Sequence, residues 1–79
     1  MVLKLDLLAR NLLVEEYPDS AGELKESGDD SFLLETDIYN ILDIGRFYCG
    51  LVGHVEIVGA PGLEEYARDY FEKALKSLK

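Results

Sequence analysis

Cys49 and His54 are the residue types that first suggest chemistry, because a nearby thiol and imidazole could act as a nucleophile and its base. Such a pair needs a base within hydrogen-bond reach and a third group that orients it. Cys49 instead lies in an apolar run typical of a small core side chain, and His54 opens a predicted strand as a surface residue. A single cysteine and a single histidine also fall short of the four ligands usual in a closed zinc site. We therefore predict no catalytic residue, no metal site, no cofactor and no internal disulfide.

Acidic pairs at positions 15–16 and 29–30 are a second candidate for catalysis. Catalytic carboxylates of glycosidases face each other across a cleft, whereas side chains of adjacent residues point apart. The loop at 59–62 leads into a predicted helix, whose N-terminus could bind an anion. This loop has no phosphate-binding lysine and is followed by Glu64 and Glu65. We interpret these segments as solvent-exposed turns and connectors.

The composition limits the function classes further. The chain has 79 residues, of which 48% are hydrophobic and 30% charged, and this balance is typical of a folded protein. Its net charge of −8 would repel phosphates over most of the surface, which disfavours general nucleic-acid binding. The sequence has no apolar stretch long enough for a membrane span and no secretory signal pattern at its start, so we expect a cytoplasmic protein.

Hydrophobic periodicity predicts an alternating series of strands and helices. Asp6 is expected to cap the first helix, Pro18 to end it, and Thr36 or Asp37 to cap the second. A polar edge strand, a turn at 27–30 and a third strand together form a hairpin. The expected strands cover residues 2–5, 21–27, 31–36 and 54–58, and the expected helices 7–17, 37–49 and 63–79.

This order predicts one α+β domain over residues 1–79. Two β-α-β units with right-handed crossovers fold into a ferredoxin-like βαββαβ sandwich, in which two helices cover one face of a four-stranded antiparallel sheet. The final helix is an addition to that plan. The second strand then lies at an edge, in agreement with its charged side chains.

The two later helices carry more apolar surface than a domain of this size is expected to bury, which points to association with a partner. A single larger core would explain the same residues. Gly45 lies inside the second helix, where glycine costs roughly 1 kcal/mol relative to alanine, so we expect close packing there. The possible interface residues are Ile44, Phe47, Tyr48, Leu51, Tyr66 and Tyr70.

Arg46 is the polar residue of most interest, because it lies in this apolar helix beside Phe47 and Tyr48. Its side chain either extends from a packed face into water or contacts a ligand or partner.

Three segments resemble the C-terminal extension that follows the WYL domain in many bacterial transcriptional regulators. The first is VLKLDLLARNLLVEEYP at 2–18, similar to that family's first strand, helix and helix exit. The second is SGDDSFLLET at 27–36, similar to its polar hairpin and third strand. The third runs from 38 to 65 and includes Gly53, VEIV at 55–58 and PGLEE at 61–65. The chain departs from the family at Phe47, where many relatives have tryptophan, and in a short, glycine-rich segment before His54.

The resemblance implies a non-catalytic dimerisation and ligand-response module of a bacterial transcriptional regulator, and it implies that the chain is a fragment of a longer regulator. It implies a homodimer that also contacts the upstream WYL domain. DNA would be bound only through an N-terminal helix-turn-helix domain, which is absent here. The alternative is a free-standing ferredoxin-like domain that binds a small molecule or another protein.

Overall fold

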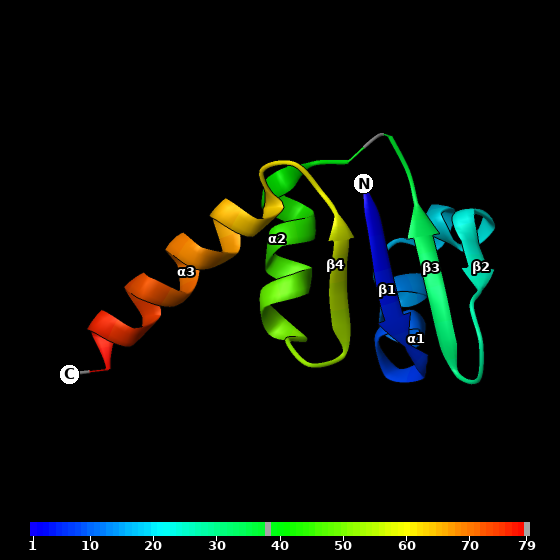
Figure 1. Ribbon diagram of the computed structural model, residues 1–79, viewed down its shortest axis with the longest axis horizontal. Coiled ribbons are helices and arrows are strands. Elements are labelled where there is room, and N and C mark those ends of the chain that lie inside the picture. The colour runs from blue at the N-terminus through cyan, green and yellow to red at the C-terminus, as the bar shows by residue number, and fades with distance from the viewer. Residues whose placement is uncertain (38, 79) are drawn as a thin grey trace.

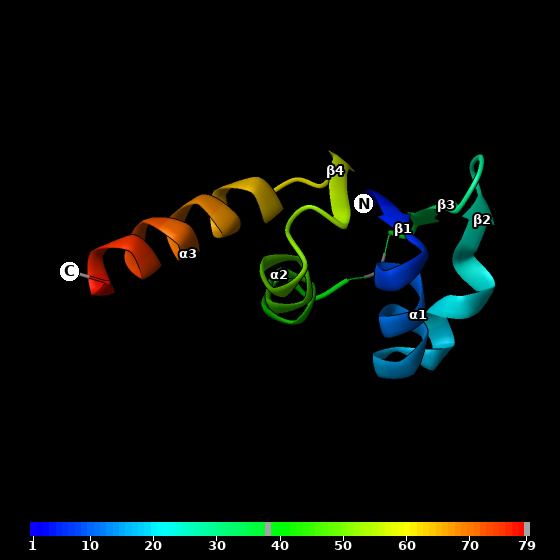
Figure 2. The same cartoon turned by 90° about the horizontal axis from the view of Figure 1, so that it is seen from below.

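The computed structural model describes residues 1–37 and 39–78 and is an α+β fold with a four-stranded antiparallel sheet. The sheet order is β2-β3-β1-β4. Helices α1 and α2 lie on one face of the sheet, and α3 extends away from this body (Figures 1 and 2). The strands are β1 (Val2–Asp6), β2 (Leu24–Glu26), β3 (Ser31–Glu35) and β4 (Val55–Gly59), and the helices α1 (Leu7–Glu16), α2 (Ile41–Gly50) and α3 (Leu63–Ser77).

Strand β1 lies inside the sheet and sets the position of its neighbours. Leu3 is opposite Leu34 of β3 and Ile57 of β4, and Leu5 is opposite Phe32 and Val55. Since side chains alternate along a strand, this row faces α1 and α2, while Lys4 lies on the open face. The row packs against buried residues of the helices and of the β4–α3 connection, and the buried side chains are Leu3, Leu5, Ala9, Leu13, Leu34, Ile44, Phe47, Val55, Ala60, Leu63 and Ala67.

The ends of α1 follow the sequence prediction. The Asp6 carboxylate accepts a hydrogen bond from the Ala9 backbone N–H over 2.9 Å, as an N-cap does. Helix α1 ends at Glu16, because Pro18 disfavours helical geometry at Tyr17. The turn that joins β2 and β3 is also where it was predicted, and the Ser27 N–H donates to the Ser31 carbonyl over 2.8 Å.

The prediction of a strand over 21–27 was wrong in its first half. Pro18–Glu23 forms a 3₁₀ helix, η1, and β2 covers Leu24–Glu26. Pro18 favours a helical start because its ring fixes φ, and the Ser20 N–H donates to the Tyr17 carbonyl to close the first turn. Strand β2 does lie at an edge, as its charges predicted.

The predicted start of the second helix was also wrong. Asn40 is the N-cap of α2, and its side-chain oxygen accepts from the N–H groups of Leu42 and Asp43. The Thr36 N–H instead donates to the Met1 carbonyl over 3.0 Å, which continues the pairing of β3 with β1. Ile38, which was assigned to this helix, lies outside the described residues.

Candidate functional site

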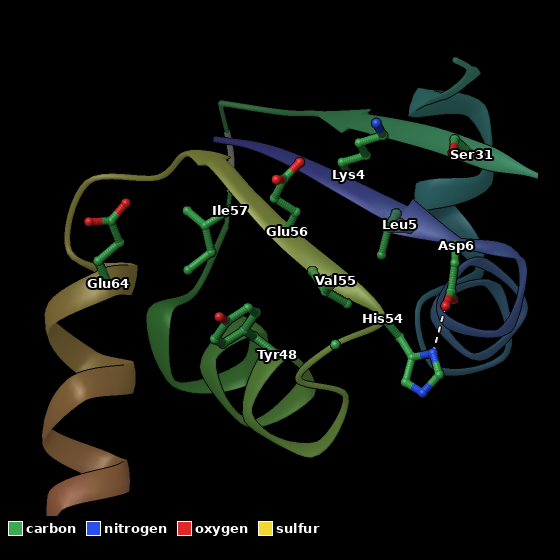
Figure 3. Close-up of a pocket in the computed structure, with 11 residues that line it drawn as sticks. Lys4, Leu5, Asp6, Ser31, Tyr48, His54, Val55, Glu56, Ile57 and Glu64 are labelled. Atoms are coloured by element: carbon green, nitrogen blue, oxygen red, sulfur yellow. Dashed lines mark hydrogen bonds and ion pairs between the residues drawn. The ribbon is translucent and has the colours of Figure 1, made fainter. Parts of the chain in front are cut away.

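An open hollow of about 540 Å³ surrounds the outer edge of β4. Figure 3 shows Lys4 and Glu56 on the open side of the sheet, whereas Tyr48 of α2 lies on the other side. Glu64, at the start of α3, is at the opposite end of the hollow from His54. The polar groups therefore line this edge without converging on one point.

Asp6 and His54 form the one ion pair found in the described part of the chain. The Nδ1 atom of His54 lies 2.6 Å from Oδ2 of Asp6, and the Asp6 N–H donates to the His54 carbonyl over 3.0 Å. Both side chains are 43% exposed. The pair ties the N-terminus of α1 to the start of β4, because Asp6 also caps α1 through Ala9.

The chemistry of this pair is limited by its surroundings. The hydrogen bond from the Ala9 N–H, and after it the bond with His54, hold the pKa of Asp6 below its usual value. A hydrolytic site would need a nucleophile hydrogen-bonded to the second ring nitrogen. Among the described residues, no hydroxyl or thiol has such a bond with His54. Burial raises the pKa of the Cys49 thiol, which disfavours the reactive thiolate.

The six predicted interface residues are found in different environments. Ile44 and Phe47 lie inside the chain's own core, where they offer little contact surface. Tyr48 and Leu51 are half-buried and pack against that core. A larger internal core therefore accounts for the apolar face of α2, which was the alternative that the sequence left open.

Tyr66 explains why α2 contains a glycine. Its ring lies against Gly45, so a Cβ atom at position 45 would be 2.4 Å from Cε1 of Tyr66. Two helices approach this closely only where a side chain is missing, as was expected for Gly45. The contact fixes the first half of α3 on α2, with Leu63 and Ala67 also buried.

The second half of α3 has a different environment. Tyr70 is 47% exposed, Leu75 67% and Leu78 81%, and Figures 1 and 2 show this end of the helix extending beyond the body. The molecule measures 40 × 24 × 21 Å as a result. We name residues 70–78 the arm. Its exposed side chains continue the apolar stripe that begins at the buried Leu63.

A groove between α1 and α2 contains the residue that was singled out as a possible partner contact. It has a volume of about 400 Å³ and is lined by Leu12, Glu16, Tyr17, Asp43, Arg46, Phe47, Gly50 and Leu51. The rings of Tyr17 and Phe47 meet edge to face with centroids 6.2 Å apart. The Tyr17 hydroxyl donates to the Asp43 carbonyl over 3.3 Å, and burial raises the pKa of this phenol. Arg46 is exposed at this groove.

Sequence reasoning missed both the Asp6–His54 pair and the groove. The pair had a usable signal, because in the expected topology the last strand runs antiparallel to the first. The end of β1 then meets the start of β4, which brings Asp6 to His54. The groove had no such signal, since it depends on the spacing between two helices that are not adjacent in sequence.

Comparisons with protein-family models, with curated proteins and with solved structures found no match. Over residues 1–37 and 39–78, no cluster of three or more histidine, cysteine or acidic side chains is suited to hold a metal ion. No helix in the same ranges has the length and apolar character needed to cross a membrane.

Proposed function

We propose that this chain is a non-catalytic association module, which uses the arm of α3 to dock on a partner. The observation that carries the proposal is the exposed apolar stripe of the arm at Tyr70, Leu75 and Leu78. Isolated helices shorter than about 12–15 residues are marginal in water, so a helix end that leaves the body needs further contacts. A partner that covers the stripe would supply them.

The wider setting that we propose is a cytoplasmic bacterial transcriptional regulator with a WYL domain. The support is the sequence pattern of the C-terminal extension together with a strand order and helix placement compatible with a ferredoxin-like sandwich. In such a regulator the module would contribute to dimerisation and ligand response, and DNA binding would belong to another domain. The net charge of −8 agrees with that division of roles.

The proposal is tested by sedimentation velocity over a wide concentration range, on this chain and on a longer regulator that contains it. The double variant Leu75→Ser/Leu78→Ser should weaken association at least roughly tenfold, because burial of one leucine side chain is worth about 1.5–3 kcal/mol. Val58→Ser is the matched control, since Val58 is 57% exposed on the open face of the sheet. Its association should equal that of the wild type.

Two results would contradict the proposal. One is a strict monomer at high concentration for both the chain and the longer protein. The other is unchanged association of the Leu75→Ser/Leu78→Ser variant. Chemical denaturation of the wild-type monomer and of the Leu75→Ser/Leu78→Ser monomer should give similar free energies of unfolding, because both leucines are exposed.

A further inference from the structure

We propose that the partner of the arm is a second copy of this chain, and that the arm docks in the groove between α1 and α2 of that copy. This inference rests on the proposed function, and it names the partner and the receiving surface. It makes the groove residues Glu16 and Asp43 part of the interface, and it gives Arg46 a role as a partner contact.

The geometry prevents the arm from reaching the groove of its own chain. Helix α2 contacts α3 through Gly45 on one side, and it lines the groove with α1 through Asp43, Phe47 and Gly50 on another. Since α3 is a continuous helix from Leu63 to Ser77, the arm continues away from the body (Figure 2). The groove and the arm are therefore both open to a second molecule.

Apolar complementarity is the first argument for this pairing. The floor of the groove is apolar, with the half-buried Leu12 on α1 and the half-buried Leu51 at the end of α2 beside the buried Phe47. The arm offers Leu75 and Leu78 on one face of a helix. An amphipathic helix that lays its apolar face into such a groove is a common mode of recognition.

Charge complementarity is the second argument and favours a second copy over other partners. The arm has Lys73 on one border of its apolar stripe and Glu72 on the other, as the helical period places them. The groove has the carboxylates Glu16 and Asp43 at its rim. Because the whole chain carries −8, the positive end of α3 is the complement of its own body.

Arg46 also lines the groove, where it would repel a lysine. Glu72 lies on the border of the stripe opposite Lys73, so the docked arm would present one charge of each sign to the groove. Docking that brings Glu72 to Arg46 and Lys73 to the carboxylates satisfies both signs. The placement of opposite charges on the arm and the groove favours one orientation of the docked helix.

Two such contacts form at once if the copies exchange arms. A two-fold axis repeats each contact, so the arm of each copy lies in the groove of the other. The exchange closes the assembly at a dimer and doubles the buried surface.

The test uses the charge variants Glu16→Lys and Lys73→Glu in the whole chain. Each variant alone places like charges in both contacts of its own dimer, so its association should weaken by roughly 5- to 10-fold. An equimolar mixture of the two variants should regain nearly wild-type association. In the mixed dimer, one contact pairs Lys73 with Glu16 and the other pairs the two substituted residues, with signs exchanged.

Matched controls change the same charges away from the groove. Glu35 and Lys25 are exposed on β3 and β2, and the pair Glu35→Lys and Lys25→Glu should associate like the wild type, alone or mixed. Sedimentation equilibrium gives the dissociation constants.

The possible outcomes separate this inference from the proposed function. Recovery in the mixture supports arm exchange with a second copy. If the wild type associates and Leu75→Ser/Leu78→Ser abolishes it, but Glu16→Lys has no effect, the arm binds elsewhere and this inference is overturned while the proposed function stands. The wild-type chain could also be a strict monomer that assembles through the arm only as part of a longer protein. That result would overturn the inference that the arm docks on a second copy of this chain.

Discussion

Gly45 and Tyr66 decide how closely α3 can approach α2. Gly45→Ala would gain roughly 1 kcal/mol of helix propensity, but overpacking of this kind typically costs about 1–3 kcal/mol. The added Cβ would lie 2.4 Å from the Tyr66 ring, so we expect a net loss of about 1 kcal/mol in the free energy of unfolding. Urea denaturation measures this loss.

A second background isolates the cause of that loss. In a Tyr66→Ala protein the same Gly45→Ala change should be stabilising, because the ring no longer opposes the gain in helix propensity. Gly50→Ala serves as a control, since no atom lies within 4 Å of a Cβ built there. A stabilised Gly45→Ala protein with Tyr66 intact would show that the helices do not make this contact.

Asp6 makes stability depend on pH on the acid side. Hydrogen bonds from the Ala9 N–H and from His54 hold its pKa below the ordinary value of 3.8. Because the folded pKa is below the unfolded one, the ionised carboxylate stabilises the fold above the unfolded pKa, and this contribution is lost as the pH falls through the folded pKa. Asp6→Asn should therefore give a shallower decline of the unfolding free energy below pH about 4.

Asparagine is the informative replacement because its side-chain oxygen can still cap α1. His54→Ala removes the second cause of the lowered pKa and should give a slope between those of the wild type and Asp6→Asn. Urea unfolding at a series of pH values measures all three slopes. Equal slopes for wild type and Asp6→Asn would contradict the interaction.

Among the elements, those with long periodic patterns or strong terminal signals were predictable from sequence. Asp6 caps α1 and Pro18 ends it, and the stripe from Leu63 onward defines α3. The elements that were misplaced are short and depend on distant contacts. The Met1 carbonyl pairs with the Thr36 N–H, and this keeps the chain extended past the predicted helix start.

The candidate site was less predictable than the fold, because surface exposure is a property of the packed molecule. Ile44 and Tyr70 have similar apolar character in the sequence, yet one is buried and the other is 47% exposed. What separates them is the direction of α3 relative to α2, which the Gly45–Tyr66 contact sets. Periodicity identifies an apolar face but does not tell whether the same chain covers it.

The start of α2 gives a prediction at the element scale. Asn40 accepts hydrogen bonds from Leu42 over 2.9 Å and from Asp43 over 3.3 Å. Asn40→Ala should lower the free energy of unfolding by about 1 kcal/mol, the usual effect of losing a cap. Asn40→Asp should retain the stability, because aspartate caps equally well and its charge favours the helix N-terminus. Equal stability of the alanine and aspartate variants would exclude the capping role.

The whole molecule combines an acidic body with an arm that is apolar and basic at its end. The body repels a second copy at long range, while the docked arm would attract it at short range. Salt acts differently on the two effects, because charges interact over a screening length of about 30 Å at 0.01 M and about 8 Å at 0.15 M ionic strength. The shorter dimensions of the molecule are 24 and 21 Å, so repulsion between bodies falls within the first range and outside the second.

We therefore expect added salt to strengthen self-association at first. In the proposed dimer Lys73 and Glu16 would be in direct contact, well inside either screening length, and the contacts of Leu75 and Leu78 are not electrostatic. Between about 0.01 M and 0.15 M salt, the repulsion of two chains that each carry −8 is reduced far more than these contacts are. Sedimentation equilibrium at the two ionic strengths should give a smaller dissociation constant at the higher one. A dissociation constant that rises instead would contradict this expectation. It would mean that salt weakens the attraction between the lysines and carboxylates more than it weakens the repulsion between the two bodies.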